Sequence, residues 1–391
     1  SGHLTAGTHT GIEAVSALSG ADAGNYTFAA PTGDYTVSQL ALTGTIGTGS
    51  STYGSALTPG AASFTNAIAG DTLGTATIAI NTSGLTSSSG HLRAGTHTGI
   101  ESVSALSGAD AGNYTFAAPT GDYTVNQLAL AGAIATGSST YGSPLVPGAV
   151  SISNVISGDL VNAPGASVNT AGLTSSSGHL IAGTHTGIES VSGPLGGADA
   201  GNYILGAISG DYIVNKQSVT VVATGANKVY DATTSDLVTL TGNGLISGDK
   251  VTFSDTSANF ANKNVGTGKT VTVSGIGAGG ADAGNYQVSN STASTTADIT
   301  PLAINVAAVG ANKTYDGNTT GVVTLSGGLA GDAVTFSDTS ANFADRNAGI
   351  GKIVSIAGIT ASGADAGNYT VNSTATTTAN ITPATLTYNA N

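Results

Sequence analysis

Six histidines fall into three matched pairs, and each pair is followed by a glutamate. The two histidines of a pair are six residues apart, and the glutamate comes four residues later. On one straight strand these even spacings would place all three side chains on the same face. Two imidazoles and a carboxylate could bind a divalent metal ion. The three sets are His3, His9 and Glu13; His91, His97 and Glu101; and His179, His185 and Glu189.

The span of these sets argues against a metal site. Six residues of strand separate two Cα atoms by ~20 Å, so a turn would be needed to bring His91 and His97 together. We therefore expect surface or inter-repeat contacts for these histidines and no bound cofactor. Calcium at repeat junctions stays open as an alternative, although no Asp-X-Asp-X-Asp-Gly loop is present.

Composition excludes several classes of protein. The 391 residues include 9 Lys and Arg, 22 Asp and Glu, and no Cys. A net charge of −13 argues against nucleic acid as a partner, and no apolar run approaches the ~18 residues of a membrane helix. Without Cys there is no thiol nucleophile, and a hydroxyl nucleophile would need an adjacent base and an orienting group in one pocket. The sequence predicts that the chain is not an enzyme.

Internal repeats organise the chain. Ser1-Gly2-His3-Leu4 returns at residues 89–92 and 177–180, and Ala-Asp-Ala-Gly-Asn-Tyr occurs five times. The predicted units are the C-terminal half of a repeat at 1–38, first-type repeats at 39–126 and 127–215, second-type repeats at 216–301 and 302–383, and the start of a further repeat at 384–391. This layout leads us to expect a parent chain that is longer at both ends.

The sequence within a repeat favours β-structure. Ser218–Val222, Lys250–Phe253, Thr270–Val273 and Tyr369–Val371 alternate apolar residues with Thr or Ser. Turn pairs such as Asn243-Gly244 separate them. We predict an all-β chain, a tandem array of immunoglobulin-like antiparallel β-sandwiches that forms an elongated rod.

The Ala-Asp-Ala-Gly-Asn-Tyr motif fits the corner before a strand of an immunoglobulin-like domain. There a tyrosine hydroxyl bonds back to the backbone, two residues before a core position. We expect that the glycine can take a positive φ and that the aspartate can cap the turn. The predicted structural tyrosines are Tyr26, Tyr114, Tyr203, Tyr286 and Tyr369.

Two signatures indicate a known class of repeat. Residues 228–234 (Lys-Val-Tyr-Asp-Ala-Thr-Thr) and 313–320, with the Ile-Thr-Pro ends at Pro301 and Pro383, resemble the YDG repeat. The first-type repeats, with Thr52-Tyr53-Gly54 and Thr140-Tyr141-Gly142, resemble the related MBG repeat. Ala232 departs from the Asp-Gly of the pattern. Both repeats occur in filamentous-haemagglutinin-like and biofilm-matrix adhesins of bacteria.

This resemblance implies an extracellular, cell-surface location in a secreted bacterial protein, of the Gram-negative type. We expect a structural stalk that projects an adhesive tip or links cells in a biofilm matrix. One alternative is binding of exopolysaccharide or of host or bacterial surface glycans through exposed Tyr, Thr, Ser and Asn side chains. Another is self-association into fibres through edge strands, by contacts between identical repeats.

Overall fold

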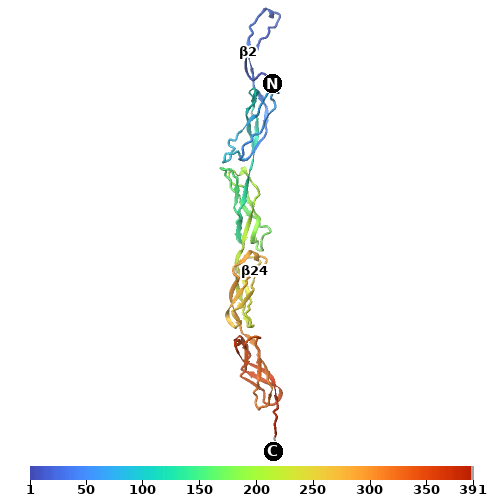
Figure 1. Cartoon of the computed structure of the whole chain (residues 1–391), viewed down its shortest axis with the longest axis vertical. Coiled ribbons are helices and arrows are strands. Elements are labelled where there is room, and N and C mark those ends of the chain that lie inside the picture. Colours follow the sequence, from blue (N-terminus) through green and yellow to red (C-terminus); the bar gives the residue numbers. More distant parts are fainter. Residues whose placement is uncertain (118, 389–391) are drawn as a thin grey trace. The chain divides into compact units, whose positions relative to one another are not determined.

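The computed structural model describes residues 1–117 and 119–388. These residues form strands joined by loops, with single turns of 3-10 helix and no α-helix among them (Figure 1). The prediction of an all-β repeat chain is confirmed. The chain divides into two compact units, Ser1–Ser138 with Leu145–Asn169 and Thr184–Ile213, and Ser139–Pro144 with Thr170–Gly183 and Val214–Asn391.

The first unit begins with an antiparallel pair, β1 (Gly7–Ala14) and β2 (Thr32–Val37). The repeat at 39–126 then forms a four-stranded sheet in the order β5-β10-β8-β7. The other strands of this repeat form two separate pairs, β3–β9 and β4–β6. The strands of this repeat are β3 (Leu40–Leu42), β4 (Gly44–Ile46), β5 (Gly49–Thr52), β6 (Ala62–Phe64), β7 (Ala76–Ile80), β8 (Gly95–Leu106), β9 (Tyr114–Phe116) and β10 (Thr120–Asn126).

The next repeat has corresponding strands, and β3 and β4 are replaced by one longer strand. This strand, β11 (Leu128–Ile134), pairs with β13 (Val150–Ser153) on one side and β16 (Tyr203–Leu205) on the other. The remaining strands are β12 (Gly137–Thr140), β14 (Gly165–Val168), β15 (Gly183–Ser192) and β17 (Ser209–Asn215).

In the second unit, the repeat at 216–301 forms the sheets β20-β18-β25 and β19-β26-β23-β22 and the pair β21–β24. Valines of β18 and β23 that alternate with Thr, such as Val221, Val271 and Val273, are buried, which explains why these segments form strands. The strands are β18 (Gln217–Gly225), β19 (Lys228–Val229), β20 (Val238–Asn243), β21 (Thr252–Ser254), β22 (Ser257–Phe260), β23 (Gly266–Ser274), β24 (Gly277–Gly279), β25 (Tyr286–Val288) and β26 (Thr292–Thr300).

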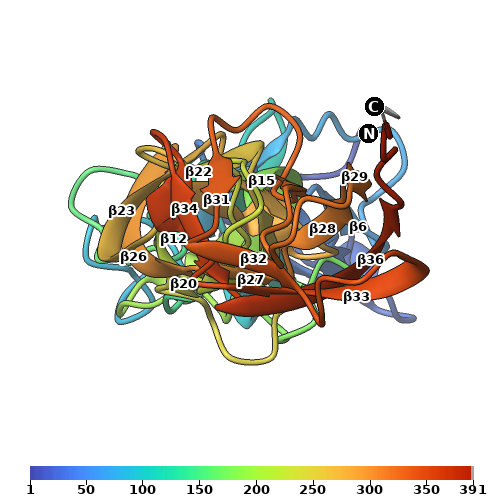
Figure 2. The same ribbon diagram turned by 90° about the horizontal axis from the view of Figure 1, so that it is seen from below.

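The repeat at 302–383 follows the same plan, and Figure 2 shows its two long antiparallel strands, β33 and β36, side by side. Its sheet order β29-β36-β33-β32 matches that of the preceding repeat. Residues 384–388 form no strand, and residues 389–391 of the predicted further repeat lie outside the described part. The strands are β27 (Leu302–Ile304), β28 (Ala307–Gly310), β29 (Lys313–Thr314), β30 (Val323–Ser326), β31 (Thr335–Ser337), β32 (Ser340–Phe343), β33 (Gly349–Ala357), β34 (Thr360–Ser362), β35 (Tyr369–Val371) and β36 (Thr374–Thr382).

The structure adds parallel pairings to the predicted antiparallel ones. The first strand of a repeat runs parallel to the short strand that follows the Ala-Asp-Ala-Gly-Asn-Tyr motif, as β18 does with β25. A later strand near the start of the repeat runs parallel to the final strand of the repeat, as β19 does with β26. Each repeat is therefore closed by contacts between its two ends in the sequence.

The motif itself folds in the same way each time. Its Ala-Gly-Asn forms a turn of 3-10 helix, and the tyrosine that follows takes extended backbone angles. These turns are η1 (Ala23–Asn25), η2 (Ala111–Asn113), η3 (Ala200–Asn202), η4 (Ala283–Asn285) and η5 (Ala366–Asn368).

Candidate functional site at the joints between repeats

Successive repeats meet at a shared aspartate. In the first unit this is Asp159, which lies in a turn of the repeat at 127–215. Tyr53 of the preceding repeat donates its hydroxyl to Asp159 Oδ2 at 2.5 Å, and Tyr203 of the same repeat donates to that oxygen at 2.6 Å. The other oxygen accepts the backbone N–H of Ser89 at 3.0 Å. One carboxylate thus binds groups from two repeats.

The polar residues of the motif extend this joint. Asp199 accepts the N–H of Leu160 from its own repeat at 2.9 Å and the N–H of Ser88 from the preceding repeat at 3.2 Å. Asn202 accepts the N–H of Ala94, also from the preceding repeat, at 2.9 Å. The motif therefore forms a turn and also accepts hydrogen bonds from the preceding repeat. We call the accepting groups, here Asp159, Asp199 and Asn202, the receiving face of the joint.

The same joint recurs inside the second unit. Tyr141 and Tyr286 donate their hydroxyls to Asp249 Oδ2 at 2.6 and 2.5 Å, and Ser177 N–H binds the other oxygen at 3.2 Å. Here a first-type repeat precedes a second-type repeat, so the receiving face is the same in both types. The accompanying contacts are Ser176 N–H to Asp282 at 3.2 Å and Ala182 N–H to Asn285 at 2.8 Å.

Between the two second-type repeats, a lysine takes the place of the serine loop, the segment whose backbone N–H groups (Ser88 and Ser89, or Ser176 and Ser177) bind the aspartates at the other joints. Tyr230 and Tyr369 donate their hydroxyls to Asp332 Oδ2 at 2.7 and 2.5 Å. The ammonium of Lys263 lies 2.5 Å from Asp332 Oδ1 and 3.2 Å from Asp365 Oδ1. An ion pair therefore occupies the position of a backbone hydrogen bond, and the amide contact is kept as Val265 N–H to Asn368 at 2.9 Å.

A partial version of the joint lies at the start of the first unit. Tyr114 donates to Asp71 at 2.6 Å, and the terminal ammonium of Ser1 lies 3.3 Å from the other oxygen. Ala6 N–H binds Asn113 at 2.9 Å. Residues 1–6 thus contact the receiving face as residues 89–94 do one repeat later.

Hydrogen bonds decide the ionisation of these groups. Burial raises the pKa of Asp159, but the hydrogen bonds from Tyr203, Tyr53 and Ser89 outweigh it and bring its pKa down to about 2. Burial and the bond to the carboxylate both raise the pKa of Tyr203. At neutral pH the aspartate is charged and the tyrosines are protonated, which is the state that this geometry requires.

Apolar packing continues through each joint. Tyr53 and Tyr203 meet edge to face with ring centroids 5.3 Å apart, and they share one core with Leu92, Val125 and Leu130. An aromatic pair of this kind contributes ~0.5–1.5 kcal/mol beyond its burial. The hydrophobic core therefore joins successive repeats instead of ending at each one. The other joints have matching ring pairs, Tyr141–Tyr286 at 5.4 Å and Tyr230–Tyr369 at 5.5 Å.

Comparison with known proteins identifies the second-type repeats. The YDG domain family matches residues 215–296 and 300–379.

The YDG domain model thus matches twice in this chain.

None of the curated proteins matches the sequence. Among solved structures, the crystal structure of Drosophila N-cadherin EC1-3 is similar, with 6% identity over 46% of this chain and 72% of that chain, at a TM-score of 0.15.

The signature of the YDG domain builds the donor side of the joint. Lys228 holds its own loop, because its ammonium binds Asp231 Oδ1 and the carbonyl of Ser235, each at 2.8 Å, and lies over the ring of Phe260. Tyr230 lies between these groups in sequence, and its side chain is 1% exposed. The lysine and aspartate therefore fix the loop that presents the joint tyrosine.

The five tyrosines predicted as structural do not share one environment. Tyr114, Tyr203, Tyr286 and Tyr369 are buried, whereas Tyr26 is 70% exposed. Each buried hydroxyl accepts a backbone N–H 40 to 47 residues upstream and donates to the joint aspartate, instead of bonding to the backbone a few residues away. The accepted N–H groups belong to Ile68, Ile156, Ile246 and Leu329.

The structure separates the candidate metal ligands. Glu101 is fully buried and accepts the N–H of Gly60 at 2.8 Å. His97 Nε2 lies 2.8 Å from the carbonyl of Arg93, and His91 packs edge-on against Tyr53 at the joint. Among residues 1–117 and 119–388, no three His, Asp or Glu side chains gather as a metal site requires.

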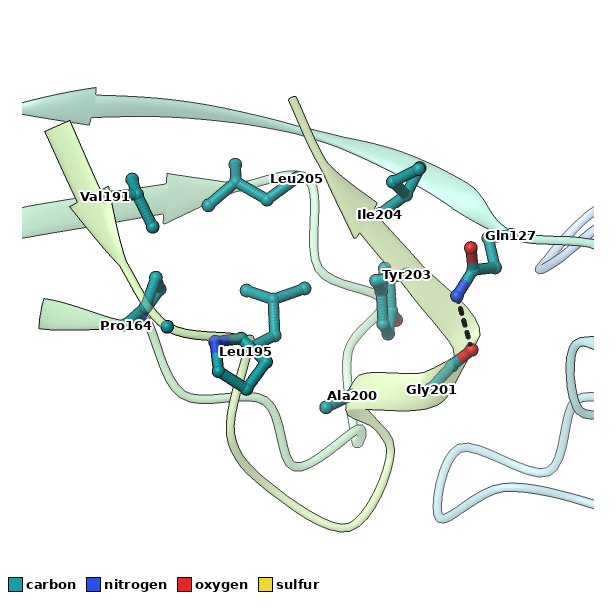
Figure 3. Close-up of a pocket in the computed structure, with 11 residues that line it drawn as sticks. Gln127, Pro164, Val191, Leu195, Ala200, Gly201, Tyr203, Ile204 and Leu205 are labelled. Carbon is teal, nitrogen blue, oxygen red and sulfur yellow. Dashed lines mark hydrogen bonds between the residues drawn. The ribbon is translucent and has the colours of Figure 1, made fainter. Parts of the chain in front are cut away.

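A cavity of about 360 Å³ lies beside η3 (Figure 3). Gln127 closes one side, where its amide donates to the carbonyl of Gly201 at 2.9 Å, and Leu195 and Leu205 point into it. No charged side chain lines this cavity. In the described part of the chain, no helix is long and apolar enough to cross a membrane.

Proposed function

We propose that this chain is a non-enzymatic structural segment of a secreted bacterial surface adhesin, in which tandem repeats act as an extended spacer. The observation that carries the proposal is the recurrence of one joint, two tyrosines on one aspartate, at three places. A spacer needs such contacts, because stability in a tandem array comes from nearest-neighbour interfaces as well as from single repeats.

The use of the polar side chains supports a structural role over a catalytic one. The joint aspartates are saturated by tyrosine hydroxyls together with backbone N–H groups or a lysine. The buried carboxylates of Glu101 and Glu189 accept N–H groups of Gly60 and Gly148 at 2.8 and 2.7 Å within their own repeats. Groups engaged in this way stabilise the fold and do not leave a nucleophile beside a free base.

Composition and family support the extracellular part of the proposal. The chain has no Cys and carries −13 net charge, so folding outside the cell needs no disulfide formation. YDG repeats are the module that the sequence shares with bacterial surface adhesins. Binding of polysaccharide and fibre formation through edge strands stay predictions from the sequence.

Small-angle scattering of the chain in solution tests the spacer role. Four repeats of 30–40 Å, as sandwiches with strands of five to six residues have, predict a maximum dimension of roughly 150 Å. Asparagine at positions 159, 249 and 332 should broaden the distance distribution, because each joint loses its anion. A compact globular particle for the unchanged chain would end the proposal.

A further inference from the structure

The repeat at 302–383 presents the donor half of a joint. Tyr315 corresponds to Tyr230, which is 1% exposed in its joint, yet Tyr315 is 39% exposed. Within the described residues no group bonds to the Tyr315 hydroxyl. An amphipathic tyrosine that is buried at each occupied joint is thus left in water here.

The loop around this tyrosine already has the conformation of an occupied joint. The N–H of Tyr315 binds the carbonyl of Thr382 at 2.8 Å, as that of Tyr230 binds Thr300 at 2.9 Å. Lys313 lies 2.8 Å from Asp316, which repeats the ion pair of the preceding domain. The tyrosine is therefore held in place before any partner arrives.

Arg346 supplies the cation of this half-joint. It occupies the position of Lys263, and its loop is fixed in the same way. Asn347 N–H binds Asp345 at 2.8 Å, and Lys352 forms an ion pair with Asp345. In the occupied joint the residue corresponding to Asp345 is Asn262, which binds the N–H of Asn264 and the ammonium of Lys269. A guanidinium suits two neighbouring carboxylates, because its donors form a planar fork.

We propose that Tyr315, Arg346 and the backbone N–H of Ala348 form an open half-joint that binds the receiving face of another repeat of this class. The partner is defined by chemistry: a Gly-Asp turn, whose carboxylate takes Tyr315 and Arg346, and an Ala-Asp-Ala-Gly-Asn-Tyr segment, whose asparagine takes Ala348 N–H. Ala348 occupies the position of Val265, which binds Asn368 in the occupied joint.

Either type of repeat fits this half-joint. The receiving faces around Asp159, Asp249 and Asp332 use the same residue types, although their donors are serine loops at two joints and Lys263 at the third. The Gly-Asp turn and the Ala-Asp-Ala-Gly-Asn-Tyr motif thus form the same receiving face in both types of repeat. This inference depends on joint geometry alone and does not require an adhesin.

The test extends the chain after Asn391 with a second copy of residues 310–383, which completes a repeat in register because Asn391 occupies the position of Val309. We expect site-resolved nitration of Tyr315 and hydrogen exchange of the Ala348 amide to slow by at least about tenfold relative to the unextended chain. Arg346→Ala should reverse much of the protection, and Arg346→Lys should keep it.

The matched control carries asparagine at the two appended positions copied from Asp332 and Asp365. It should fold like the extended chain but leave Tyr315 reactive. Unchanged nitration and exchange in the extended chain would overturn the proposal. So would an appended copy that exchanges like an unfolded chain, because the same sequence folds at 302–383 and the half-joint would then fail to order its partner.

Discussion

Tyr53 and Tyr203 lie in successive repeats and donate their hydroxyls to the same oxygen of Asp159, at 2.5 and 2.6 Å. Their rings also meet edge to face, at 5.3 Å. Each tyrosine therefore fixes the anion that the other needs, so the two repeats are coupled through one carboxylate.

Replacing the shared anion should loosen its joint. Asp159→Asn places an amide opposite two hydroxyls and a backbone N–H, so we expect a loss of about 2 kcal/mol in the free energy of opening the joint. Hydrogen exchange at the Ser89 amide measures this. Asp255→Asn, at a half-buried aspartate of a different repeat, is the control and should leave that amide unchanged; equal exchange in both variants would contradict the account.

The joint should weaken in acid. The pKa of Asp159 is lowered to about 2 in the folded state from 3.8, so its stabilisation is complete above pH ~4 and is lost as the pH falls toward 2. Protection of the Ser89 amide should follow this window. In Asp159→Asn, protection of the Ser89 amide should not change with pH in this window. If protection in the unchanged chain were instead lost with a midpoint near pH 6, Asp159 would not be the group that titrates.

The joint between the YDG domains should be the one most sensitive to salt. The hydrogen bond that Lys263 donates to Asp332 raises the pKa of Lys263, and this lysine is partly exposed. Lys263→Met should speed hydrogen exchange of the Val265 amide by roughly threefold to fivefold. In the unchanged chain, 1 M NaCl should also speed this exchange, by a smaller factor, because salt screens the ion pair. Lys250→Met serves as the control. Insensitivity of Val265 to both changes would remove the ion pair from the explanation.

Ala232 marks a strained position in the first YDG domain. It has a φ of 63°, where the second domain has Gly317 at 83°. Left-handed backbone costs an alanine ~1–2 kcal/mol, and the extra freedom of glycine in the unfolded chain offsets part of the gain. We expect Ala232→Gly to stabilise this domain by about 0.5–1 kcal/mol in denaturant unfolding. A destabilised variant would show that the strain is absent.

The strands and the repeat class could be predicted because they depend on local patterns. Alternation of Val with Thr at 270–273 places one face on a core, and this segment lies in β23. The same alternation shows which face is buried but not which strand is the neighbour. The parallel pairing of β18 with β25 joins residues about 70 apart and was not predicted.

The joints were missed because each looks like an ordinary feature in one sequence. Gly158-Asp159 reads as a turn, Tyr53 as part of a repeat signature, and the Ala-Asp-Ala-Gly-Asn-Tyr motif as a corner. A signal was present, since every full repeat carries all three. Their polar atoms meet only when two repeats are placed end to end.

A double-mutant cycle on Tyr53→Phe and Tyr203→Phe tests the central claim most directly, because each change removes one hydroxyl from Asp159 and keeps both rings. The free energy of unfolding is measured for the four chains. We predict that the double variant departs from the sum of the single changes by about 0.5 kcal/mol or more. Additive effects, within ~0.3 kcal/mol, would show that the two tyrosines do not act through one carboxylate and would contradict the account.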